Sequence, residues 1–361
     1  MKVAVIFCLL LARLDFRGVW VPRWSIADHE KILANLDGRF NHIFLQVFAL
    51  GETWYPSELA PNHLTSDEWL TEFLAEAHRR KIKVSAWINV FYSWGFAPPS
   101  SDPRHPINAH PDWYLLNRAG RSILDYTAEE LRARDMEGYY LAPAHPGVRD
   151  YLLRIVGELI QKYDFDGIHF DYIRYPNGQF TGDPQLRTQF DRKYYFDPFD
   201  LARAESLQLR ISQWGYDDLT EKWQRFPPDN LSALVAQLYR KVKSVKPGLL
   251  VSAAVKPDYR TAKDDYLQDW QSWLNAGDID FVCLMAYGRD LRTILKNDLA
   301  AITDPGRVVV GLGAYAQSSG TIAEQVEEVA QSPFLGVTIF SYEDLKKDRQ
   351  YLNALGLPAL R

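Results

Sequence analysis

Short runs of apolar and β-branched residues alternate with amphipathic stretches along almost the whole chain, and this alternation limits the possible folds more than any other feature. A β-rich run followed by a stretch with apolar residues three and four apart predicts a strand–helix unit. The sequence contains eight such units. The predicted strands cover residues 16–21, 42–48, 82–90, 166–172, 249–255, 280–286, 307–313 and 336–341.

Eight strand-then-helix units favour an α/β protein with a closed (β/α)8 barrel, the TIM barrel, over an open doubly wound sheet. The predicted helices cover residues 28–38, 66–80, 147–163, 228–245, 262–275, 292–302, 321–331 and 343–354. The first strand is not followed by Gly-x-Gly-x-x-Gly, and no Gly-x-x-x-x-Gly-Lys-Ser/Thr occurs. We therefore predict one barrel domain over residues 14–355 and expect no cofactor.

Two of the connections are too long to be simple turns. Residues 91–146 follow the third predicted strand, and residues 173–227 follow the fourth. The loops after the strands of such a barrel form the rim where active sites lie, and long ordered loops are often functional. We expect both insertions to build the rim.

The composition narrows the class of partner. The 361 residues carry a net charge of -5, which argues against binding nucleic acid through a basic surface. Aromatic residues make up 14% of the chain, including 11 Trp and 20 Tyr. Flat rings stack on the apolar faces of sugars, so this density suits a polysaccharide partner.

The N-terminus allows two interpretations. Lys2 and the apolar run over residues 3–12 resemble the start of a signal peptide, and the run is too short to span a bilayer. A secretory start predicts a secreted or periplasmic protein. A buried N-terminal segment leaves a cytoplasmic location open. Cys8 and Cys283 lie in apolar runs, so we expect buried thiols with no disulfide framework or zinc pattern.

The segment 163–176 contains the sharpest candidate chemistry. Alternation along its strand places His169, Asp171 and Ile173 on one face, and residues 168, 170 and 172 on the other. If the second face meets the helices, His169 and Asp171 point into the barrel, and Asp171 stands near the C-terminal mouth. A carboxylate there needs a partner. The alternative is that Asp171 only pairs with Arg174 or caps a loop.

Residues 166–171, Asp-Gly-Ile-His-Phe-Asp, followed by Tyr175-Pro176, resemble a motif of the glycosyl hydrolase-like 10 family. The resemblance extends over residues 14–345 through several further stretches in the same order. These are Phe16-Arg-Gly-Val-Trp20, Phe44-Leu-Gln-Val47, Tyr55-Pro-Ser57, Ala86-Trp-Ile-Asn89, His110-Pro-Asp-Trp-Tyr114, Tyr140-Leu-Ala-Pro143 and Val148-Arg-Asp-Tyr151.

The resemblance implies a TIM-barrel glycoside hydrolase that acts on bacterial cell-wall glycan, specifically peptidoglycan strands without their peptides. The sequence departs from the family pattern in two places. The family often has a second Asp after the position of Asp171, where this chain has Tyr172. The family's Asn/Asp-Pro-Gly before the fourth helix is Ala142-Pro143-Ala144 here.

Glycoside hydrolysis usually requires two carboxyl groups, an acid and a nucleophile or base. Asp171 is the first. It would be the nucleophile or stabiliser if ionised, and an acid only if burial raises its pKa. The sequence does not fix the second. We prefer Asp258, because it follows the strand next to that of Asp171. Further rim candidates are Glu52, Asp290 and Glu343, whereas Asp166 begins its strand and is interpreted as structural.

Several residues near strand ends are candidates for binding the substrate, with packing in the core as the alternative for each aromatic ring. Gln46, Trp87 and Asn89 could donate to sugar hydroxyls or stack, and Tyr287 could hydrogen-bond an oxyanion or an N-acetyl group. The remaining candidates are Trp94, Trp113, His169, Arg174 and Tyr175.

Two other functional classes stay open. In the first, His169-x-Asp171 contributes ligands to a metal-dependent, deacetylase-like barrel hydrolase, although the other His residues show no paired spacing. The second is a non-catalytic glycan-binding barrel.

Overall fold

The computed structural model describes residues 14–36, 38–203, 211–288, 291–293, 295, 302–347 and 351. Eight parallel strands form one closed barrel, because β1 pairs with both β2 and β11. The strands around the barrel are β1 (Phe16–Val21), β2 (His42–Ala49), β4 (Lys83–Asn89), β7 (Gly167–Asp171), β8 (Leu250–Val255), β9 (Phe281–Met285), β10 (Val308–Gly313) and β11 (Gly336–Phe340). The predicted TIM barrel is confirmed.

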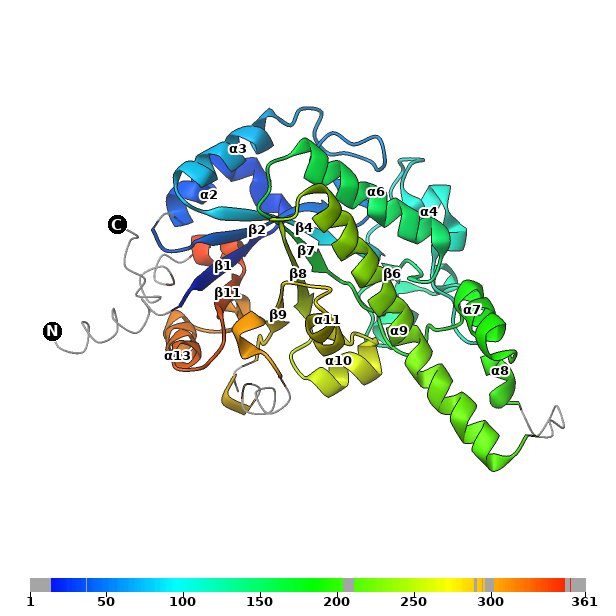
Figure 1. Ribbon diagram of the computed structural model, residues 1–361. Coiled ribbons are helices and arrows are strands. Elements are labelled where there is room, and N and C mark those ends of the chain that lie inside the picture. The colour runs from blue at the N-terminus through cyan, green and yellow to red at the C-terminus, as the bar shows by residue number, and fades with distance from the viewer. Residues whose placement is uncertain are drawn as a thin grey trace.

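Helices surround the barrel, as the ribbon in Figure 1 shows. The predicted helix 262–275 is wrong in one respect: it is two helices, because Leu267 adopts a left-handed φ of 55° and Asp269 caps a new start. Most of the predicted helix 292–302 lies outside the described residues. The surrounding helices are α2 (His29–Leu36), α3 (Glu68–Arg79), α6 (Pro146–Lys162), α9 (Gln213–Val245), α10 (Tyr259–Tyr266), α11 (Trp270–Ala276), α13 (Ser319–Ala330) and α14 (Tyr342–Lys347).

Helix α9 begins earlier than predicted. Pro227 and Pro228 favour a start at residue 228, yet the helix runs through both from Gln213. Its first half packs against α7 (Pro184–Tyr194) and α8 (Pro198–Leu201) through an aromatic cluster with Phe190 and Trp223 rings 5.2 Å apart, edge to face. Figure 1 shows this half projecting away from the barrel. Aromatic packing therefore supports the turns that the proline pair weakens.

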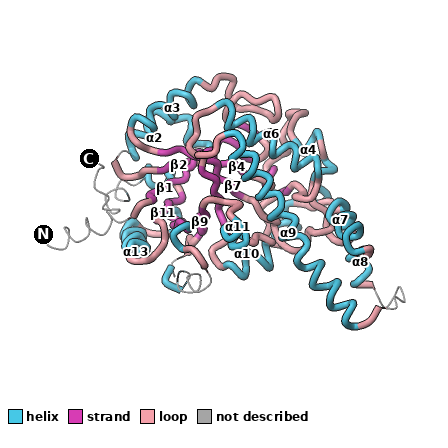
Figure 2. The backbone as a smooth tube through the Cα atoms, in the orientation of Figure 1, coloured by secondary structure: helices cyan, strands magenta, loops and turns pink. Residues whose placement is uncertain are grey.

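The two long insertions occupy the end of the barrel where the strands finish. The first follows β4 and contains a small antiparallel sheet of β5 (Tyr92–Trp94) and β6 (Tyr139–Tyr140), with α4 (Pro106–Ala109) and α5 (Ala128–Arg132) between them. The second follows β7 and contains α7, α8 and the start of α9. Figure 2 shows the strands at the centre, with helices and loops outside them.

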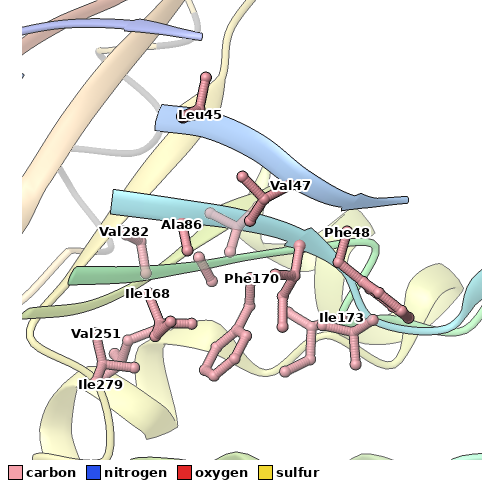
Figure 3. Close-up of a cluster of buried hydrophobic side chains, with 14 of the residues drawn as sticks. Leu45, Val47, Phe48, Ala86, Ile168, Phe170, Ile173, Val251, Ile279 and Val282 are labelled. Atoms are coloured by element: carbon pink, nitrogen blue, oxygen red, sulfur yellow. The ribbon is translucent and has the colours of Figure 1, made fainter. Parts of the chain in front are cut away.

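The two faces of β7 separate as the alternation predicts. Ile168 and Phe170 point outward into the apolar layer beneath the helices, beside Val251 and other aliphatic residues (Figure 3). The prediction that Ile173 shares the face of His169 and Asp171 is wrong, because Ile173 is buried in the same outer layer as Ile168 and Phe170. The strand ends at Asp171, and Tyr172 has a left-handed φ of 53°, which interrupts the alternation.

The interior of the barrel is filled by rings and one hydrogen-bonded imidazole. His169 is fully buried; its Nε2 accepts from Trp20 Nε1 at 3.0 Å, and its Nδ1 lies 2.9 Å from Ser252 Oγ. Cys283 lies buried in the same interior cluster, as predicted, whereas Cys8 is outside the described residues. The barrel is thus a packed core and not a pore.

The search for spans that could cross a bilayer found no helix with the required length and apolar character in the part of the chain that is described.

Burial of imidazoles in this interior predicts a loss of stability in acid. Burial lowers the pKa of His42 from 6.5 to about 3, and lowers the pKa of His169 well below its usual value. Below about pH 6.5 the unfolded chain therefore binds protons that the folded chain does not, at a cost of about 1.4 kcal/mol per pH unit and residue.

We expect His169→Gln and His42→Gln each to reduce the slope of unfolding free energy against pH between pH 7.5 and 5, measured by urea unfolding. Two independent positions keep the test informative if one variant does not fold. Wild-type slopes in both variants would contradict this account.

Candidate active site

Asp171 is the last residue of β7 and stands at the C-terminal end of the barrel. Its Oδ2 accepts from Trp87 Nε1 at 3.1 Å, and its Oδ1 accepts from the amide of Tyr172 at 2.8 Å. The residue is only 8% exposed. Burial raises the pKa of Asp171, and the charge of Arg174 together with the two hydrogen bonds lowers it in part. The net shift is upward, which favours a protonated carboxyl that can donate a proton.

The backbone turns sharply after this carboxyl. Tyr172 has a φ of 53°, a conformation that costs energy for a residue with a side chain and is often found at functional sites. Its ring stacks on Tyr92 with centroids 4.6 Å apart, and the Arg174 guanidinium lies 4.4 Å from the ring centroid. The stacked rings hold the turn in place and keep Arg174 beside the site.

Arg174 links the fourth barrel strand to the first insertion. Its Nη2 lies 3.2 Å from Glu137 Oε1, and its Nε and Nη1 are buried without a hydrogen-bond partner. Glu137 Oε2 also accepts from the Tyr140 hydroxyl at 2.8 Å. Glu137 is not among the site residues predicted from the sequence. The sequence places Glu137 in the long insertion after the third predicted strand. That position does not show which strand end the side chain approaches.

The predicted polar residues of β2 and β4 meet beside this site. Gln46 Oε1 accepts from the backbone amide of Arg23 at 3.2 Å, and Gln46 Nε2 donates to Asn89 Oδ1 at 3.2 Å. Asn89 is the register partner of Asp171 across the β4–β7 pair. The structure therefore brings Gln46, Asn89 and Trp87 together with Asp171.

Tyr287 approaches the same site from the end of β9. Its ring stacks on Phe340 at 5.4 Å and meets Tyr315 edge to face. Burial and, next, the charge of Asp171 raise the pKa of Tyr287 well above its usual value. The hydroxyl stays protonated at neutral pH and can donate a hydrogen bond near Asp171.

Other predicted contacts lie inside the protein. His169 is fully buried with both ring nitrogens engaged, and Tyr175 is fully buried as well. Neither side chain is exposed in the described structure, and a direct contact of either with a glycan stays a prediction. Trp94 is also buried and donates to the carbonyl of Ala97, while Trp113 stacks on His110 at 3.8 Å.

The carboxylates proposed as partners of Asp171 have other roles in the described structure. Asp258 caps α10 by accepting from the amide of Thr261 at 2.7 Å, and this hydrogen bond lowers the pKa of Asp258. Glu52 lies 2.7 Å from His63 Nε2, and Glu343 accepts from Ser25 Oγ at 2.5 Å. Among described residues, no hydrogen bond or ion pair joins these three to Asp171.

Two further carboxylates complete this set. Asp290 lies outside the described residues. Asp166 lies at the opposite end of the barrel, where its Oδ2 accepts from the amide of Val84 at 2.8 Å and lies 2.9 Å from His78 Nε2. These contacts agree with a structural role for Asp166.

A metal site requires several donors at one place. No group of three or more His, Cys, Asp and Glu residues is arranged to hold a metal ion in the described ranges. His169 uses both ring nitrogens within the barrel interior, so the predicted His169-x-Asp171 ligand pair is not formed.

Solved structures share the architecture. The glycoside hydrolase domain of PgaB (BpsB) from Bordetella bronchiseptica superimposes with a TM-score of 0.72 at 15% identity, over 96% of this chain and 99% of that domain. At this identity, the likeness concerns the fold.

Sequence relatives give the family. Glycosyl hydrolase YngK from Bacillus subtilis is 25% identical over 68% of this chain and 46% of its own length. Glycosyl hydrolase DigH from Escherichia coli is 24% identical over 72% of this chain and 57% of its own length. The chain thus spans about half the length of these relatives. The family model for glycosyl hydrolase-like 10 matches residues 15–301, and the chain belongs to that family.

Proposed function

We propose that this protein is a glycoside hydrolase that cleaves glycosidic bonds of a bacterial polysaccharide by carboxyl catalysis. The observation that carries the proposal is Asp171, a carboxyl with a raised pKa at the C-terminal end of the barrel. This end of a (β/α)8 barrel is where catalytic residues lie. Membership of the glycosyl hydrolase-like 10 family supports the same reaction class.

Asp171 supplies the proton in this scheme. Protonation of the leaving oxygen requires a carboxyl that is neutral near the working pH, and burial shifts the pKa of Asp171 in that direction. Trp87 Nε1 and the amide of Tyr172 hold the carboxyl in one orientation and stabilise the carboxylate left after transfer. In this scheme, the Tyr287 hydroxyl donates a hydrogen bond to the sugar that binds beside Asp171.

The substrate that we propose is peptidoglycan glycan without its peptides. Membership of the glycosyl hydrolase-like 10 family supports a bacterial cell-wall glycan as the substrate. Exposed aromatic rings at the rim of the barrel support sugar binding. Trp24 follows β1 and Tyr315 follows β10, and these side chains are 57% and 58% exposed. A cell-wall substrate implies that the protein acts outside the cytoplasm, in agreement with the signal-like N-terminal sequence.

Asp171→Asn keeps the shape of the side chain but removes its proton, so we expect kcat on peptide-free glycan strands to fall by roughly 100-fold or more with the fold intact. Release of reducing ends and product masses measure the activity, and circular dichroism checks the fold. The same assays are run on a panel of other glycans, namely chitin and α- and β-glucans.

Asp258→Asn is the matched control, because Asn also caps helices well. We expect this variant to keep wild-type activity. Loss of activity in Asp258→Asn would instead support Asp258 as the partner. Full activity of Asp171→Asn on every cleaved glycan would contradict the proposal.

The alkaline limb of the pH–rate profile reports deprotonation of the acid. Trp87→Phe removes a hydrogen bond that lowers the pKa of Asp171, so the pKa rises and the limb of kcat/KM moves to higher pH by about one pH unit. Trp273→Phe is the control. Trp273 lies in α11, and its indole N–H donates to Ser232 Oγ and not to Asp171, so this variant should leave the alkaline limb in place. A shift of the limb to lower pH in Trp87→Phe would exclude Asp171 as the acid.

A further inference from the structure

We propose that Glu137, from the insertion after β4, is the second catalytic carboxyl and acts as the general base opposite Asp171. The inference rests on the proposed glycosidase function and adds the missing half of its carboxyl pair. Three contacts of Glu137 and the difference in exposure between the two acids support it.

Glu137 is held in a defined position, although it lies in a loop. The Tyr140 hydroxyl donates to its Oε2 at 2.8 Å, and the Tyr92 hydroxyl donates to its backbone carbonyl at 3.2 Å. Both tyrosines belong to the small β5–β6 sheet, whose strands flank the insertion. The carboxylate is therefore fixed by the small sheet whose first strand closely follows the end of β4.

Arg174 brings Glu137 and Asp171 into one electrostatic unit. The guanidinium pairs with Glu137 Oε1 at 3.2 Å, and its charge also acts on Asp171, three residues earlier in the chain. The charge of Glu137 raises the pKa of Asp171, as expected for two acids that share one cation. The charges of Arg174, Glu137 and Asp171 also act on Lys256, which follows β8.

The two carboxyls differ in access to water. The side chain of Glu137 is 39% exposed, whereas Asp171 as a residue is 8% exposed. A general base must reach a water molecule, and a general acid must stay protonated, so the exposed member suits the base and the buried member suits the acid.

The reaction balances with these two groups and water. A water oxygen attacks the anomeric carbon while its proton passes to the Glu137 carboxylate. The bond from the anomeric carbon to the leaving oxygen breaks, and that oxygen takes the proton of Asp171. One water is consumed, and the proton on Glu137 returns to Asp171 through solvent. This single displacement inverts the anomeric configuration.

Glu137→Gln tests the role directly. We expect kcat on the cleaved glycan to fall by roughly 100-fold or more, with KM changed much less, because the base acts in the transition state. Glu129→Gln is the matched control, since Glu129 lies in the same insertion with its side chain 83% exposed. It should keep wild-type kcat. Unchanged kcat in Glu137→Gln would overturn the role of Glu137 and leave the proposed function standing.

Chemical rescue separates catalysis from structure. In Glu137→Ala, azide can replace activated water as the nucleophile and should restore turnover with formation of a glycosyl azide. A merely structural role predicts no rescue and no azide product, which would overturn the proposal. If Glu137→Ala does not fold, the Glu137→Gln kinetics and the titration below decide.

A titration without substrate keeps the inference independent of the glycan. The carboxyl carbons of the protein are labelled, and the signal of Asp171 is assigned as the one that Asp171→Asn removes. We expect Glu137→Gln to lower the pKa of Asp171 and Arg174→Gln to raise it. If the wild type cleaves no glycan in the panel, the proposed function fails. If Asp171 has the same pKa in the wild type, in Glu137→Gln and in Arg174→Gln, the pairing with Glu137 is wrong.

Discussion

The pairing of β1 with β11 closes the sheet, and the arrangement of the site depends on this closure. In a closed barrel, alternate side chains of every strand enter one shared interior, which must be filled. Rings from β1, β2, β4 and β9 fill the middle, and His169 adds a polar group whose two nitrogens are satisfied by Trp20 and Ser252. Two residues further along β7, the same inward face reaches the open end, where Asp171 emerges.

The order of strands then selects the neighbours of that carboxyl. β7 lies between β4 and β8, so Trp87 and Asn89 come from one side and Lys256 from the other. The insertion after β4 brings Glu137 to the same place through the β5–β6 sheet. A buried acid and the cation beside it thus come from the end of β7, and a more exposed acid comes from the separate insertion after β4. Their charges must balance locally, because a single uncompensated charge at this depth is costly.

Patterns of period two and period 3.6 were sufficient to predict the eight strands, the closed barrel and the inward direction of Asp171. They failed where local geometry overrides periodicity. Ile173 lies in the outer layer because Tyr172 reverses the alternation, and α9 extends through a proline pair because its first half packs on α7 and α8. Glu137 was not predicted, because its position depends on how the irregular insertion after β4 folds. Asp258 was favoured by strand order alone, which does not reveal that its carboxylate caps α10.

The reversed turn at Tyr172 also limits how this segment can change over evolutionary time. One residue in the left-handed conformation sends Tyr172 to the mouth, returns Ile173 to the outer layer and presents Arg174 to Glu137. Adding or removing one residue there would place the cationic side chain in the apolar outer layer and the apolar side chain beside Glu137. Lineages with this arrangement should therefore accept replacements in the tripeptide after Asp171 far more readily than changes in its length.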